Sequence, residues 1–407
     1  MSASKTDLRR ILVARGLRAF GDGFVSLLLP IYLLELGWSP LRVGIVATAT
    51  LLGSGAMTLA VGRYAARFPY RTLLLAASVL MIATGLGFAT LTAFWPLAVV
   101  AFVGTLNPSS GDVSVFLPLE HALISRLARD DRRTAAFAHY SLTGSLSAAV
   151  GSLAAGLPAL ATAAFGIAPL AAMQAMFVLY ALCAVAAAFA YRGLPPALAA
   201  GAHAGAAPLR TSKRNVYALA ALFSLDSFGS GFVVQSMVAL WLYQTFDLPL
   251  AAAGTLFFWT GVLSALSFMV AVRIAGRIGL VNTMVFTHLP ANLCLVAIPF
   301  VPSLAGVVAL LLVRSALSQM DVPTRSSYVM AIVPPAERPA AASMTAVPRS
   351  LASAIGPFLA GWLLGASPFG WPFLAAGATK IAYDVLLLAR FRGVKPPEEA
   401  IKGVRLD

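Results

Sequence analysis

Long apolar runs recur along the whole chain, and this pattern limits what the chain can fold into. A helix needs about 20 predominantly apolar residues to cross a bilayer, and such a run plus its connection repeats about every 30–35 residues here. The 407 residues are 59% hydrophobic and only 11% charged, with a mean hydropathy of +0.86. A soluble domain is about 45–50% apolar and about 25% charged. We therefore predict an all-α integral membrane protein with no sizeable soluble domain.

The runs predict about twelve transmembrane helices. They lie at residues 10–37, 41–62, 71–92, 95–125, 134–160, 167–191, 214–244, 249–273, 280–300, 304–333, 338–365 and 369–391. The first run contains Arg15, Arg18 and Asp22 and no small-residue cleavage site, so we expect a retained helix and not a cleaved signal peptide.

Lys and Arg residues concentrate in alternate connections between the runs. The net charge is +14, but a nucleic-acid-binding protein would gather its basic residues on a soluble face. One set of connections holds nearly all of them, and the other offers only Arg42. Because basic loops stay in the cytoplasm, we expect both termini on the cytoplasmic side of a bacterial inner membrane, and no nucleic-acid partner.

Motifs for metal, cofactor or enzyme chemistry are missing from the sequence. Cys183 and Cys294 lie inside apolar runs and lack metal-ligand spacing. There is no GxxxxGK[ST] segment to cradle the phosphates of ATP, and no nucleophile–His–acid set stands out. We expect a protein without cofactor or metal that is neither an enzyme nor an ATP-driven pump.

A polar break near the middle divides the chain into two related halves. Residues 193–213 are rich in Gly, Ala and Pro, which is typical of a linker, and separate bundles at 1–192 and 214–407. The segment RAFGDGFVSLLLPIYL from Arg18 aligns with DSFGSGFVVQSMVALW from Asp226, and both keep FGxGFV. The pair SSGDV and SQMDV, ending at Val113 and Val322, repeats further on. The repeats predict two six-helix halves of common descent.

These features resemble the major facilitator superfamily, whose two six-helix bundles enclose a central substrate site. After its second span that family carries G-x-x-x-D-R-x-G-R-[KR]. The segment GRYAARFPYR keeps Gly62, Arg67 and Arg71, with Ala66 in place of the acid, and RIAGRIG in the second half keeps Arg277. The resemblance implies that these four residues act in a gate or loop.

Two glycine-rich segments resemble the family's antiporter motif G-x-x-x-G-P-x-x-G-G. SAAVGSLAAG keeps Gly151 and Gly156, and ASAIGPFLAG keeps Gly356, Pro357 and Gly361. Two interpretations stay open. The small residues let helix backbones approach closely, or they mark a proton antiporter.

Charged residues within the spans are the candidate functional groups, because each costs about 2.5–3.5 kcal/mol to insert. Arg314, Asp321 and Arg325 share one helix face at about 100° per residue. The resemblance places the first, fourth, seventh and tenth helices around the cavity, which adds Arg18, Asp22, Asp112 and Asp226. Asp112 and Asp321 are equivalent in the two halves, and Arg18 is equivalent to Asp226 with opposite charge.

We expect two groups of residues to act in transport. The residues expected to couple protons to transport are Asp22, Asp112 and Asp321. Asp112 is preferred because no basic residue lies within four positions of it on its own helix. Guanidinium groups bind carboxylate or phosphate, and aromatic rings stack on solutes. The residues expected to bind substrate are therefore Arg18, Asp226, Arg314, Arg325, Arg349, Phe24 and Phe232. The alternative is that Arg18–Asp22 and Asp321–Arg325 are permanent pairs that only hold helices.

Other polar residues in the spans favour structural roles. Glu120 ends the fourth span near the cytoplasm, where it is solvated or acts in a gate. Lys380 and Asp384 form an i,i+4 pair in the last span, and His288 is a lone histidine in a helix interface. Pro108 and Pro323 flank the two equivalent aspartates and predict local unwinding.

The sequence indicates a monomeric secondary transporter that works by rocking of two bundles in the lipid bilayer, with a small-molecule substrate and protons as partners. Proton-coupled export of a small organic solute is the first hypothesis. Proton-coupled uptake of a small anionic metabolite is the alternative, which the arginines favour. A non-transporting membrane sensor or lipid-binding protein is the alternative from another class.

Overall fold

The computed structural model is almost entirely helical. It describes residues 2–64, 67–109, 114–127, 133–195, 209, 211–334 and 337–394, and within them the backbone alone at 2–4, 62–64, 133, 134, 272, 323 and 339. Nine helical segments in these ranges are long and apolar enough to cross a membrane, and two shorter apolar helices accompany them. The predicted all-α membrane class is confirmed. Asp112, the preferred proton-coupling residue, lies outside the described residues.

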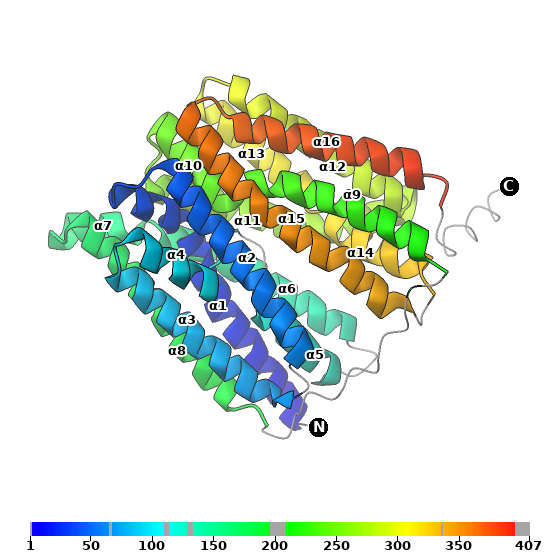
Figure 1. Ribbon diagram of the computed structural model, residues 1–407, viewed down its shortest axis with the longest axis horizontal. Coiled ribbons are helices and arrows are strands. Elements are labelled where there is room, and N and C mark those ends of the chain that lie inside the picture. Colours follow the sequence, from blue (N-terminus) through cyan, green and yellow to red (C-terminus); the bar gives the residue numbers. More distant parts are fainter. Residues whose placement is uncertain are drawn as a thin grey trace. The chain divides into compact units, whose positions relative to one another are not determined.

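The helices follow the expected spans in chain order (Figure 1). Those before the linker are α1 (Ser2–Glu35), α2 (Pro40–Tyr64), α3 (Tyr70–Thr90), α4 (Phe94–Val103), α5 (Phe116–Leu127), α6 (Arg133–Ala154), α7 (Leu157–Phe165) and α8 (Pro169–Arg192). Those after it are α9 (Lys213–Phe232), α10 (Gln235–Phe246), α11 (Leu250–Ile278), α12 (Leu280–Ala297), η3 (Ile298–Phe300), α13 (Leu304–Ser318), α14 (Asp321–Ile332), α15 (Arg338–Ala366) and α16 (Trp371–Phe391).

The fourth, seventh and tenth expected spans are each broken into two helices. The breaks separate α4 from α5, α9 from α10, and α13 from α14. Proline lacks an N–H and disfavours helix at the preceding residue, which accounts for the break near Pro108 and for the position of Pro323 in the first turn of α14. The Pro108 carbonyl accepts a hydrogen bond from the Ser236 N–H at 3.1 Å. The predicted unwinding beside both prolines is confirmed.

Packing groups the chain into two compact units. The first contains Met1–Ala202 with Val234–Gly261, and the second contains His203–Val233 with Val262–Asp407. The segment from Val234 belongs to the first unit because Gly254 packs on the Ser152 carbonyl, where an added Cβ would lie 2.4 Å from the oxygen. These units follow packing and not the internal repeat, so the division into bundles at 1–192 and 214–407 stays a prediction.

The repeated FGxGFV motif is a helix-packing device. A Cβ at Gly23 of α1 would lie 2.1 Å from the Ala148 carbonyl oxygen of α6, and one at Gly231 of α9 would lie 2.3 Å from the Ser353 carbonyl oxygen of α15. In both units, therefore, the helix with the motif touches a neighbouring backbone that only glycine can approach. Figure 1 shows α9 running beside α15, the neighbour with which it makes its most extensive contact.

The first glycine of the motif packs against a second neighbouring helix in each unit. Gly21 lies against the Tyr180 ring of α8, and Gly229 lies against Lys380 of α16. Gly151 and Gly356, from the two antiporter-like segments, complete the contacts of α6 with α1 and of α15 with α9. Close packing is thus a confirmed role of these small residues, because helices in lipid associate through such contacts and not through the hydrophobic effect.

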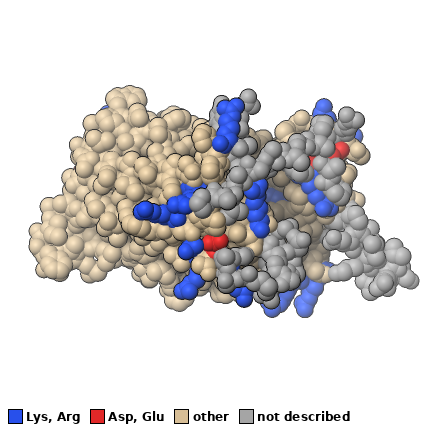
Figure 2. Space-filling model, turned by 90° about the horizontal axis from the view of Figure 1, so that it is seen from below, with Lys and Arg blue, Asp and Glu red and all other residues tan. Residues whose placement is uncertain are grey.

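The first helix is central and many other apolar side chains face outward. In α1, 83% of the most apolar 18-residue stretch is buried within the protein, whereas the corresponding share in α11 is 24%. Trp95, Phe165, Phe189 and Phe300 are each at least 66% exposed. Figure 2 shows Lys and Arg gathered on one part of the face that it views, with a broad area bearing neither basic nor acidic side chains. Exposed apolar side chains of this kind match contact with lipid.

We predict that Gly231→Ala destabilises the protein, because its methyl group would meet the Ser353 carbonyl oxygen at 2.3 Å and force α9 away from α15. Overpacking of this kind costs about 1–3 kcal/mol or more. The measurement is the unfolding temperature of purified protein. Gly365→Ala is the matched control, since no atom lies within 4 Å of a Cβ there. Equal unfolding temperatures for the two variants would contradict this packing role.

Candidate functional site

The first unit buries an ion pair between α1 and α5. Arg18 Nη2 bonds to Glu120, whose carboxylate also accepts hydrogen bonds from the hydroxyls of Tyr140 and Tyr191, both at 2.6 Å. The Arg18 guanidinium lies over the Phe116 ring, 4.1 Å from its centroid. Glu120 is 0% exposed, so the expectation that it is solvated is wrong. Its face of α5 turns inward, and a buried carboxylate is stable there because these groups donate to it.

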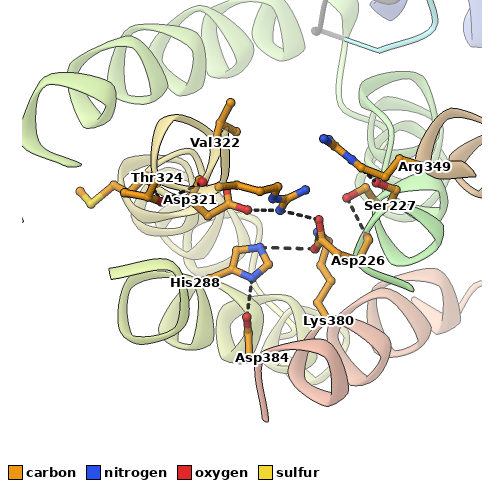
Figure 3. A network of polar contacts seen from close by, with 12 residues as sticks. Asp226, Ser227, His288, Asp321, Val322, Thr324, Arg349, Lys380 and Asp384 are labelled. Atoms are coloured by element: carbon orange, nitrogen blue, oxygen red, sulfur yellow. Dashed lines mark hydrogen bonds and ion pairs between the residues drawn. The ribbon is translucent and has the colours of Figure 1, made fainter. Parts of the chain in front are cut away.

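The second unit buries a larger network centred on Asp226 of α9 (Figure 3). Lys380 of α16 donates to Asp226 Oδ1 at 2.7 Å, and Arg325 of α14 donates to Asp226 Oδ2 at 2.8 Å. Arg325 also bonds to Asp321, one turn earlier on its own helix. The predicted Asp321–Arg325 pair is thus confirmed, and it is one part of a network that joins three helices.

His288 of α12 lies between two carboxylates of this network (Figure 3). Its Nδ1 is 2.9 Å from Asp384 Oδ1, and its Nε2 is 3.7 Å from Asp226 Oδ1. Asn292, one turn along α12, donates to Asp384 Oδ2 at 2.8 Å. The expected Lys380–Asp384 pair is therefore wrong. The buried side of α16 faces both α9 and α12, so Lys380 reaches Asp226 and Asp384 reaches His288.

The two networks repeat one arrangement with the charges reversed. In each unit an ion pair joins the helix with the FGxGFV motif to the second part of the broken span, as Arg18–Glu120 in one and Asp226–Arg325 in the other. Arg18 and Asp226 thus each have an oppositely charged partner within their own unit, because a buried charge is stabilised most by a partner at contact distance.

Arg314 and Arg349 belong to the second unit but form no ion pair within its described residues. The Nε of Arg314 is buried without a hydrogen-bond acceptor. The Nε of Arg349 donates to Ser227 Oγ at 3.2 Å, and Figure 3 shows this pair beside Asp226. Both arginines interact electrostatically with Asp226. The unit therefore carries two guanidinium groups whose charge is not matched by a contacting carboxylate.

The remaining predicted residues lie elsewhere in the fold. Asp22 is buried in α1. Phe24 and Phe232 are buried in edge-to-face pairs with Phe20 and Phe228, four residues earlier on the same helices. The residues from the loop motif are Gly62 near the end of α2, Arg67 before α3, Arg71 within α3 and Arg277 near the end of α11.

Sequence reasoning missed several members of the networks. Tyr140 and Tyr191 could not be recognised from the sequence, because their role depends on Glu120 of another helix. His288, Lys380 and Asp384 stood out as polar residues in apolar runs, and that signal was sufficient to find them but not to pair them. Among the described residues, no group of three or more His, Cys, Asp and Glu side chains could hold a metal ion.

Comparisons with known proteins agree with this architecture. The family model of the Major Facilitator Superfamily matches residues 11–320. The uncharacterized membrane protein YJR124C of Saccharomyces cerevisiae is 24% identical over 423 residues, which covers 95% of this chain and 94% of the yeast protein.

Solved structures of transporters share the fold. The nucleoside transporter NupG matches with a TM-score of 0.71 at 14% identity, over 95% of this chain and 99% of that one. A bacterial homologue of the iron transporter ferroportin matches with a TM-score of 0.73 at 15% identity, over 94% and 98%. The human organic anion transporter MFSD10 matches with a TM-score of 0.65 at 17% identity, over 94% and 99%. The chain therefore belongs to the Major Facilitator Superfamily and is a multi-pass membrane transporter, not an enzyme.

Proposed function

We propose that this transporter moves a small organic anion across the membrane together with protons, and that Arg314 and Arg349 bind the anion. The observation that carries the proposal is the buried Arg314 Nε without an acceptor, on a guanidinium that forms no ion pair with the described residues. An arginine within a span costs about 2.5–3.5 kcal/mol to insert. A carboxylate or phosphate group of a solute supplies the missing partner in a bidentate contact.

The charge balance of the second unit also supports an anion. Four basic residues and three carboxylates interact there through ion pairs or at longer range. With His288 neutral, this set carries one positive charge in excess. The basic residues are Arg314, Arg325, Arg349 and Lys380, and the acids are Asp226, Asp321 and Asp384. A bound monoanion makes the set neutral, whereas a cation adds to the excess. This favours the anionic solute over an unspecified organic compound.

Arg349 provides the second contact because it lies next to the network without being neutralised by it. Its hydrogen bond to Ser227 uses only Nε, so its terminal nitrogens stay available for a solute. Ser227 follows Asp226 in the chain, which links the proposed anion site to the centre of the ion network. MFSD10, with the same fold, is an organic anion transporter, so this architecture is compatible with an anionic solute.

The orientation proposed from the sequence places the basic connections in the cytoplasm. In the first unit Arg9, Arg67, Arg126 and Arg192 are exposed at connections on the predicted cytoplasmic side, and Arg42 is exposed on the other. Basic loops on the cytoplasmic side of a plasma membrane account for this asymmetry.

We predict that Arg314→Gln removes anion binding while the protein stays folded. Purified wild type should unfold at a higher temperature with at least one of lactate, benzoate and succinate than with its uncharged amide, because a ligand stabilises the folded state by mass action. The variant should lose this difference. Arg273→Gln, which changes an exposed arginine of α11, is the matched control and should keep it.

Two results would contradict the anion site. One is stabilisation of the wild type by an amide to the same extent as by its anion. The other is an Arg314→Gln variant that unfolds at a lower temperature but retains the full effect of the anion, which would make Arg314 a structural residue.

We further predict that membrane-impermeant maleimide, added outside intact cells, labels Ser39→Cys but not Thr211→Cys. Both positions are exposed, and only the second lies in a connection rich in Lys and Arg. Cys183 and Cys294 are replaced by Ala in both proteins. Permeabilised cells should give labelling at both positions, and labelling of Thr211→Cys from outside intact cells would overturn the orientation.

A further inference from the structure

Asp384 differs from the other two carboxylates of the Asp226 network. Asp226 contacts Arg325 and Lys380, and Asp321 contacts Arg325. Asp384 is 0% exposed and has no Lys or Arg within ion-pairing distance in the described part of the chain. Its partners are the ring of His288 and the neutral amide of Asn292. A buried carboxylate without a permanent cation requires another source of positive charge.

We infer that His288 and Asp384 form a proton-binding site, and that the transferable proton sits on His288 Nε2. In this arrangement Asp384 is ionised and His288 Nδ1 donates to it at 2.9 Å, because a carboxylate only accepts hydrogen bonds. The Asn292 amide nitrogen, which donates to Asp384 Oδ2, also lies 3.1 Å from His288 Nδ1. In the neutral ring the Nε2 lone pair then faces Asp226 at 3.7 Å. Uptake of a proton forms an Nε2–H bond directed at that carboxylate, and release breaks it. The ring alternates between neutral and cationic, with no other covalent change.

The charged and titratable groups around the ring come from every helix packed near it. Asp226 approaches from α9 and Asp384 from α16, and the ring centroid of Tyr383, also on α16, lies 6.0 Å from that of His288. The other charged groups of the network are Arg314, Asp321, Arg325, Arg349 and Lys380. Lys380 contacts the same Asp226 Oδ1 that faces His288 Nε2, so its positive charge opposes a cationic ring. The two carboxylates contact the imidazole at 2.9 and 3.7 Å, and both favour its cationic form.

This site connects the proton to the proposed anion site, on which its role in transport rests. A cationic His288 attracts Asp226 Oδ1, which otherwise is held by Lys380 at 2.7 Å. Asp226 then compensates less of the positive charge of its neighbours, and these include Arg314 and Arg349. Proton binding should thus strengthen anion binding, and by linkage the anion should strengthen proton binding to the same extent. Such coupling carries a proton and an anion in the same direction.

The test observes the ring directly and needs no solute. Protein with ¹⁵N-labelled histidine is placed in lipid nanodiscs, and the ring nitrogens are followed by NMR from about pH 5 to about pH 9. The chain has four histidines, so variants of His121, His139 and His203 to Asn assign His288 by elimination while leaving it intact. The expected result is a ring that changes from one N–H to two within this range in wild type.

Asp384→Asn tests the partner. At a pH where the wild-type ring carries two N–H groups, we expect the variant to have lost the second one, while Asn292→Ala keeps it. The inference is overturned if His288 has the same number of N–H groups throughout the range in wild type, or if Asp384→Asn titrates like wild type. The first criterion holds even if the variant does not fold.

Transport measurements separate this site from the proposed function. In proteoliposomes, His288→Gln should lose accumulation of benzoate or lactate driven by a pH gradient but retain exchange of the same anion. His139→Asn, at an exposed histidine of α6, should retain both activities. Loss of accumulation and exchange together would make His288 structural and contradict the inference. Absence of anion transport in wild type would refute the proposed function, and the NMR result would still decide the proton site.

Discussion

The need to compensate charge inside a membrane governs the polar interior of this protein. Lipid offers no partner to an ionised side chain, so each one must find a counter-charge or a hydrogen-bond donor on a neighbouring helix. Glu120 has an arginine and two tyrosines, and Asp226 has an arginine and a lysine. Against this background we propose a solute site at the guanidinium groups of Arg314 and Arg349, and a proton site at Asp384, which has no Lys or Arg partner in the described part of the chain.

Glycine packing allows these charges to meet. Gly21 and Gly229 bring the central helix of each unit close to its neighbour, and Gly229 itself contacts the Lys380 side chain whose amine reaches Asp226. The repeated motif is therefore both a packing surface and the support of an ion network. The same chain geometry accommodates Arg18–Glu120 in one unit and Asp226–Arg325 in the other, so the architecture fixes where an ion pair forms and not which helix supplies the positive charge.

The sequence was sufficient to predict the helical class, the span order, the breaks near Pro108 and Pro323, and the family, because hydropathy and proline act locally along the chain. It was also sufficient to predict the Asp321–Arg325 pair, whose spacing lies on one helix. It failed where partners come from different helices: Lys380 was assigned to Asp384 and not to Asp226, and Glu120 was expected to be solvated. Such contacts depend on how each helix is rotated about its axis. The rotation cannot be predicted from hydropathy when a helix is apolar on every side.

A double-mutant cycle on Asp226 and Lys380 tests most directly whether buried charges are compensated within the second unit. Thermal unfolding is compared for Asp226→Asn, Lys380→Met, the double variant and wild type. Removing one partner of a buried pair costs about 3–5 kcal/mol because the other charge is left uncompensated. We therefore predict that the double variant is destabilised much less than the sum of the single variants. Additive losses would show that the two charges do not depend on each other and would contradict charge compensation within the second unit.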